Sequence, residues 1–197
     1  MWLFLAQEVM FFGAMFCAYA VYRWMYFDAF LAGSQSLNWV LGGANTVFLL
    51  LSSFTAAMAV HSAQTGNNRK VARFLWATLV LGAIFLFIKW TYEWPPKIQY
   101  GVFPGMNFNP DAHHYPGLAA FADKGHLQLF FWLYFVMTGM HALHMVIGFG
   151  VILWLIWMAN HNHFGPRRYL QVEFFGLYWH FVDIVWVFLF PMYYLVT

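Results

Sequence analysis

The sequence predicts an all-α integral membrane bundle of five transmembrane helices. Its 197 residues are 63% hydrophobic and only 8% charged, and the mean hydropathy is +0.62. A soluble domain carries about 25% charged residues, so this chain could not cover a water-facing surface. Five apolar segments each reach the length of about 20 residues that a helix needs to cross a hydrocarbon core about 30 Å thick. The alternation of apolar and polar residues that a β-barrel requires does not occur.

The five predicted spans belong to a single membrane domain, 1–197, and cover residues 1–24, 38–60, 71–93, 127–158 and 174–196. The first begins at Met1 without the basic region and cleavage site of a signal peptide. The second is rich in small and polar residues, which suits close helix packing. The last three start or end in aromatic residues, as expected at headgroup depth. The fourth is about 48 Å long if fully helical, so it must tilt or extend beyond the membrane.

The distribution of basic residues predicts the orientation. The two short polar connections on one side of the membrane hold Arg69, Lys70, Arg73, Arg167 and Arg168. The opposite side holds Arg23, Lys97 and Lys124, spread over more chain that includes a long outer loop, 94–126. Because basic residues favour the inner side, the N-terminus is predicted inside and the C-terminus outside.

Two further features of the composition exclude other classes of protein. The net charge of +2 does not indicate nucleic-acid binding, and a single cysteine cannot form a disulfide within the chain.

A set of eight ionisable residues lies in or directly beside the apolar runs, where a charged group costs about 2.5–3.5 kcal/mol at the centre of a span. They are Glu8, Lys89, Glu93, His141, His144, Glu173, His180 and Asp183. The helical spacing places the last three on one face of the fifth span, and the first two histidines on one face of the fourth. A metal centre, a proton pathway and a set of interhelical fasteners are the three interpretations of this pattern.

The fastener interpretation is favoured over the other two. The Glu-x-x-His pairs of a di-iron bundle are absent, whereas interhelical hydrogen bonds between polar side chains contribute about 0.6–2 kcal/mol each. The helix with His141 and His144 is expected to supply the partners of His180 and Asp183. No catalytic or metal-binding residue is therefore predicted. A cluster in the outer loop is expected to face water or a partner rather than a metal; it comprises Asp111, His113, His114, Asp123 and His126.

Six motifs follow one another along almost the whole chain: FLAQEVMFFGAMFCAY, NRK, LGAIFLFIKWTYEW, TGMHALHMVIG, HNHFG and YWHFVDIVWVFLF. In this order they resemble subunit III of the haem–copper oxidases, the cytochrome c oxidase and quinol oxidase family. Longer, mitochondrial-type members of that family have seven helices, and this chain resembles the last five. Glu8 corresponds to a buried glutamate of the family, and Glu93 to the glutamate that ends the LGAIFLFIKWTYEW helix.

The resemblance implies a non-catalytic subunit of a respiratory complex that reduces oxygen to water and translocates protons. Such a subunit binds no haem or copper, which lie in partner subunits, but it holds phospholipid. It packs beside subunit I and supports that subunit's stability and proton uptake. A bacterial cytoplasmic membrane is the implied location. Three alternatives remain: a subunit III-like chain of a nitric oxide reductase, a membrane di-metal oxidoreductase and a free-standing proton channel.

Overall fold

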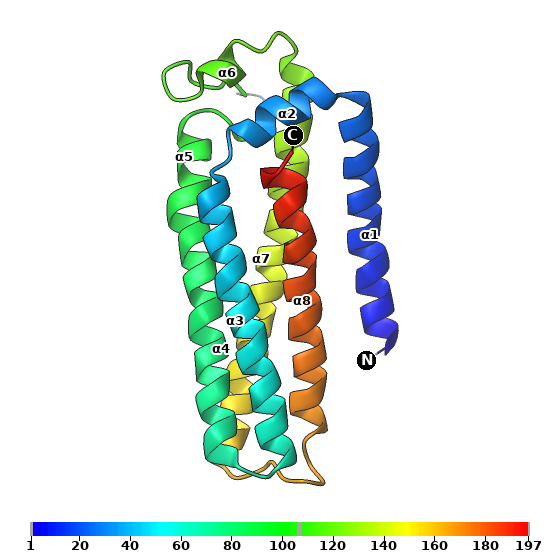
Figure 1. Cartoon of the computed structure of the whole chain (residues 1–197), viewed down its shortest axis with the longest axis vertical. Helices are drawn as coiled ribbons and strands as arrows, with labels where there is room; N and C mark the ends of the chain where they lie inside the picture. Colours follow the sequence, from blue (N-terminus) through cyan, green and yellow to red (C-terminus); the bar gives the residue numbers. More distant parts are fainter. Residues whose placement is uncertain (1, 106–107, 197) are drawn as a thin grey trace. The chain divides into compact units, whose positions relative to one another are not determined.

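The computed structural model describes residues 2–105 and 108–196, and most of this part is helical. It confirms the predicted all-α class with five helices that are long and apolar enough to cross a membrane. In Figure 1 the elements of these spans are α1 (Trp2–Met25), α3 (Trp39–Gln64), α4 (Asn68–Ile88), η1 (Lys89–Glu93), α5 (Trp94–Gln99), α7 (Lys124–Asn160) and α8 (Leu170–Tyr194). Two short helices, α2 (Phe27–Gln35) and α6 (Pro116–Ala119), lie in the connections.

Side-chain caps fix where three of the spans begin. The Asn38 side chain accepts hydrogen bonds from the backbone N–H groups of Val40 and Leu41, at 3.1 and 3.2 Å, at the start of α3. Asn67 caps α4 in the same way, and Asp123 caps α7. Asn and Asp suit this position because their oxygens satisfy backbone donors that have no partner within the helix.

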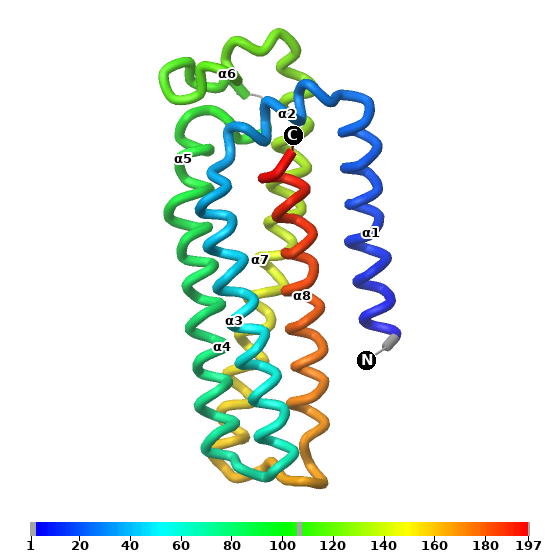
Figure 2. The backbone as a smooth tube through the Cα atoms, viewed as in Figure 1, coloured from blue at the N-terminus to red at the C-terminus, as the bar shows by residue number. Residues whose placement is uncertain are grey.

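The third span is longer than the sequence indicated. The chain continues from α4 through the π-helical turn η1 into α5, as Figure 2 shows, so residues 94–99 of the expected outer loop are helical. Pro95 and Pro96 do not interrupt the helix because they stand in the first turn of α5, where a proline needs no N–H partner. The fourth span, α7, has 37 residues and is therefore about 55 Å long.

The chain forms two compact units, and each of the four long helices after α2 contributes to both. The His180 unit comprises residues 44–87 and 141–187. Its centre is the fully buried Trp179 of α8. A Cβ atom on Gly148 of α7 or on Gly82 of α4 would lie within 2.6 or 3.1 Å of the Trp179 ring. Small residues therefore let three helices close around one indole.

The Glu93 unit comprises residues 2–43, 88–140 and 188–197. Its core is a cluster of aromatic rings in edge-to-face contact. Tyr19 of α1 lies 4.8 Å from Tyr193 of α8 and 5.2 Å from Phe30 of α2, measured between ring centroids. Phe130 and Tyr134 of α7 contact the same Tyr193 ring. Such pairs contribute about 0.5–1.5 kcal/mol each beyond the area that they bury, so they tie α1 and α2 to the longer helices of this unit.

Candidate functional site

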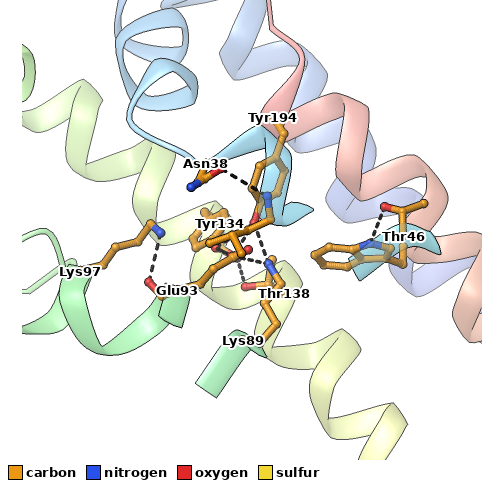
Figure 3. Close-up of polar contacts among 10 residues, drawn as sticks. Asn38, Thr46, Lys89, Glu93, Lys97, Tyr134, Thr138 and Tyr194 are labelled. Carbon is orange, nitrogen blue, oxygen red and sulfur yellow. Dashed lines mark hydrogen bonds and ion pairs between the residues drawn. The ribbon is translucent and has the colours of Figure 1, made fainter. Parts of the chain in front are cut away.

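The most polar buried site is centred on Glu93 (Figure 3). One carboxylate oxygen, Oε2, accepts hydrogen bonds from Lys89 Nζ at 2.5 Å, from Tyr194 Oη at 2.5 Å and from Tyr134 Oη at 2.9 Å. The Lys89 ammonium also donates to Tyr194 Oη at 2.6 Å. The site therefore joins η1, α7 and α8 through a single carboxylate, and all four side chains are buried.

A second buried lysine belongs to the same site. Lys97 of α5 is 5% exposed, and its ammonium donates to the backbone carbonyl of Glu93 at 3.1 Å. The ammonium also lies 5.5 Å from the centroid of the Tyr134 ring, within the range of a cation–π interaction. Lys89 thus bonds to the carboxylate of Glu93 and Lys97 to its backbone carbonyl, and both ammonium groups lie near aromatic rings. This arrangement stabilises charge inside the protein without requiring an ion or a cofactor.

The backbone that positions Glu93 is unusual. Lys89 and Glu93 are the first and last residues of the π-helical turn. Single π-turns within α-helices are rare and often occur at functional sites. The turn accommodates a Lys–Glu pair four residues apart whose side chains are 4% and 3% exposed. Buried pairs of this kind are costly unless hydrogen bonds satisfy the remaining polar atoms. The two tyrosine hydroxyls add hydrogen bonds to Glu93 Oε2, whereas Oε1 has no hydrogen-bond partner among the described residues.

A second polar site lies in the His180 unit, between α3 and α8. Three hydrogen bonds connect the two helices: Trp186 Nε1 donates to Thr46 Oγ1 at 3.1 Å, Trp179 Nε1 donates to Ser52 Oγ at 2.9 Å, and Ser53 Oγ lies 2.6 Å from His180 Nδ1. As the residue number rises along α3 it falls along α8, so the two helices are antiparallel. The polar residues of the second span therefore fasten it to the fifth.

The expectation that the helix with His141 and His144 supplies the partner of His180 is wrong. His180 meets Ser53 of α3 and not a histidine of α7. His141 of α7 instead packs its ring against Phe85 and Trp186, with centroid distances of 5.5 and 5.2 Å. His144 contributes its backbone carbonyl, which accepts a hydrogen bond from Tyr178 at 2.8 Å.

The remaining expected site residues fall into two groups. Glu8 of α1 and Asp183 of α8 are buried, with 9% and 2% of their surface exposed. Glu173 and His180 are only partly buried. Sequence reasoning missed Tyr134, Tyr194 and Lys97. A signal for the first of these was available, because Tyr134 precedes His141 by seven residues and so shares its helix face.

The candidate metal ligands do not come together in the described part of the chain, where no group of three or more His, Cys, Asp or Glu side chains could hold an ion. The outer-loop residues form two separate pairs instead: His114 with Asp111 at 2.6 Å, and His126 with Asp123 at 2.5 Å. The hydrogen bond from His114 is the main cause that holds the pKa of the Asp111 carboxyl below its usual value. Two half-exposed pairs are typical of a loop surface.

The fold and its two sites define an α-helical membrane protein with polar interhelical contacts, and comparison with known proteins narrows this class. A family model described as cytochrome c oxidase subunit III matches residues 120–197. The chain is 30% identical over 194 residues to cytochrome c oxidase subunit 3 of Synechocystis sp., covering 98% of this chain and 72% of that protein. It is 29% identical over 196 residues to quinol oxidase subunit 3 of Bacillus subtilis, covering 98% and 84%.

A third relative is a fusion protein. The heme-copper oxidase subunit I+III of Aeropyrum pernix is 30% identical over 202 residues, covering 100% of this chain and 22% of that protein. The chain belongs to the subunit III family of the haem–copper oxidases, as its six motifs indicated. The names of these relatives favour an oxidase subunit over the nitric oxide reductase and di-metal alternatives.

Proposed function

We propose that this chain is the non-catalytic subunit III of a respiratory oxidase in a bacterial cytoplasmic membrane, and that it packs against subunit I. The haem and copper that reduce oxygen then lie in partner subunits, and this chain supports the stability and proton uptake of subunit I. The observation that carries the proposal is the Aeropyrum pernix relative, whose name joins subunits I and III in one chain. Joining subunits I and III in one chain keeps them in the same membrane in equal numbers. Two subunits that pack against each other in one complex require this ratio.

Removal of this chain tests the proposed role. An oxidase complex prepared without it is expected to keep its haem spectrum and its initial rate of oxygen consumption, because the redox groups lie elsewhere. Its activity should decline sooner during sustained turnover, and its proton uptake should slow. Oxygen-electrode traces and a pH-indicator assay on matched preparations measure both effects. Loss of the haem spectrum, or identical decay with and without the chain, would contradict the proposed role.

The proposed orientation places the N-terminus inside and the C-terminus outside. Its support is the set of five exposed basic residues beside the turns that join α3 to α4 and α7 to α8. After Cys17 is replaced by serine, a single cysteine can be placed at exposed Thr65 or exposed His113. A membrane-impermeant thiol reagent is expected to label His113→Cys in spheroplasts and Thr65→Cys only after lysis. The reverse pattern would invert the topology.

We also propose that the Glu93 unit holds a phospholipid acyl chain. A groove of about 580 Å³ lies between the third span and α7, and its lining is largely aromatic and aliphatic: Trp90, Trp94, Ile98, Phe103, Pro104, Trp132, Phe135, Val136 and Gly139. Val136→Trp should fill it and lower the phospholipid retained by the purified complex, measured as lipid phosphorus. Val146→Trp, on an exposed face of α7, is the matched control. Equal retention by both variants would contradict the assignment.

A further inference from the structure

The outer loop between α5 and α7 contains the same arrangement of Asp, His and Tyr side chains twice. In the first copy, His114 Nδ1 lies 2.6 Å from Asp111 Oδ2. The His114 ring also stacks on the Tyr100 ring, with 3.7 Å between the centroids and 16° between the planes. Tyr100 directly follows α5, so this contact attaches the loop to the end of the third span. We refer to Asp111, His114 and Tyr100 as the His114 clasp.

The second copy lies where the outer loop enters α7. His126 Nδ1 is 2.5 Å from Asp123 Oδ2, and the His126 ring stacks on the Tyr26 ring at 3.7 Å and 18°. We refer to Asp123, His126 and Tyr26 as the His126 clasp. Tyr26 lies between α1 and α2, and all the residues of both clasps belong to the Glu93 unit. The two clasps therefore attach one loop to two other segments of the chain.

The carboxylates are the only ion-pair partners of these two imidazoles among the described residues. The imidazole side chains are 43% and 38% exposed, so both can exchange protons with water. Four other titratable side chains border the clasps: His113, whose ring is 5.1 Å from that of His114, Tyr115, which contacts Tyr100, Tyr22, which stacks on Tyr26, and Lys124, which donates to Asn109. The charge of each clasp thus depends on its own Asp and His.

Protonation of the histidine strengthens both contacts of a clasp. Histidine is the residue type that changes charge between about pH 5 and pH 8. An imidazolium makes a charge-assisted hydrogen bond to a carboxylate, which is roughly twice as strong as a neutral one. A cation over a tyrosine ring is also attracted to the face of that ring. The hydrogen bond from His114 lowers the pKa of the Asp111 carboxyl, so the same contact favours the ionised acid that an imidazolium pairs with.

We propose that the two clasps are a pH-dependent fastening of the outer loop, closed when His114 and His126 are protonated and looser when they are neutral. A state that binds protons more tightly becomes more populated as the pH falls, so acid holds the loop in place. In the proposed orientation the loop lies outside, where a proton-translocating complex releases protons. That consequence rests on the proposed function, whereas the clasps themselves act on either side of the membrane.

Electron paramagnetic resonance of a spin label in the loop tests the proposal. Ala120 is exposed and lies between the two clasps in sequence, so the label is attached to Ala120→Cys in the purified complex, after Cys17→Ser. The ratio of mobile to immobile label should rise by roughly 2- to 25-fold between about pH 5 and pH 8, since each exposed ion pair contributes roughly 1.4- to 5-fold. A ratio that does not change with pH would contradict the proposal.

The double variant His114→Gln/His126→Gln keeps hydrogen-bonding side chains that cannot become charged, so its ratio should not depend on pH. His113→Gln is the matched control, because His113 is exposed and has no ion-pair partner among the described residues. It should keep the wild-type response. A response that persists in the double variant, or is lost in the control, would overturn the proposal.

A second double variant, Asp111→Asn/Asp123→Asn, tests the carboxylates. It keeps both imidazoles and removes the negative charges, so the rise in the ratio with pH should become smaller. Asparagine can still accept the backbone hydrogen bonds that Asp111 and Asp123 accept from His113 and His126. A rise equal to that of the wild type would show that the ion pairs do not fasten the loop, and the proposal would be wrong.

Discussion

Replacing Glu93 with leucine is expected to destabilise the subunit by about 3–5 kcal/mol, because it leaves the buried Lys89 cation without its carboxylate. Lys89 would lose its 2.5 Å partner, and the Tyr134 hydroxyl would lose its acceptor. The effect is measured as the fraction of subunit that remains assembled on heating in mild detergent. Glu173→Leu, the same change at a partly buried position of α8, should have a much smaller effect.

The double variant Lys89→Met/Glu93→Leu separates the missing charge from the missing packing. Removing both partners of a buried ion pair is often neutral or stabilising, whereas removing one is strongly destabilising. The double variant should therefore recover most of the stability that Glu93→Leu loses. If the two variants are equally unstable, the stability lost in Glu93→Leu comes from lost packing and not from the unpaired charge of Lys89. That result would contradict the stabilising role of the Lys89–Glu93 ion pair.

Gly148→Ala should give the second large effect, a destabilisation of about 1–3 kcal/mol from overpacking. The added Cβ would lie 2.6 Å from the Trp179 ring and 3.3 Å from the Tyr178 ring. Trp179 is fully buried and its indole is bonded to Ser52, so it cannot move aside cheaply. Thermal denaturation of the complex measures the loss, together with the yield of assembled subunit.

Gly150→Ala is the matched control, two residues further along α7. Nothing lies within 4 Å of its added Cβ, so it should be neutral or, through helix propensity, stabilising by up to about 1 kcal/mol. An equal loss for both substitutions would mean that the sensitivity is a property of α7 glycines in general. The close approach of α7 to Trp179 would then have no special importance.

The spans were predictable because their signal is local. A run of apolar residues long enough to cross a bilayer defines a helix whatever its neighbours are, and α1, α3 and α8 end close to the predicted limits. The end of the third span was not predictable in this way. Two consecutive prolines predict the end of a helix, but in the structure Pro95 and Pro96 lie in the first turn of α5, directly after the π-turn.

The polar sites were only partly predictable. Glu93 stands out because an ionisable residue in an apolar run is rare and usually functional. Tyr194 does not stand out, since tyrosine is ordinary in a membrane helix, and Tyr134 is marked only by its position seven residues before His141. The pairing of Ser53 with His180 depends on the register between two helices that are distant in sequence. No local pattern encodes that register, so the expectation that α7 would supply the partner could not be corrected from spacing alone.

The two polar sites have a structural character that agrees with a supporting subunit. Glu93 binds three helices through hydrogen bonds, and the α3–α8 interface uses three more. Bonds of this kind hold a membrane bundle in one arrangement, because lipid gives little hydrophobic drive for helix association. A rigid bundle presents a constant surface to a partner subunit, as the proposed role beside subunit I requires.

The most direct test of the proposed role is purification of the assembled complex through an affinity tag on this chain, followed by an optical haem spectrum and metal analysis. The expected result is that haem and copper arrive with the tagged chain in a larger complex, and that the chain separated from its partners retains neither. A chain that purifies alone and carries its own bound iron would contradict the assignment as a non-catalytic oxidase subunit.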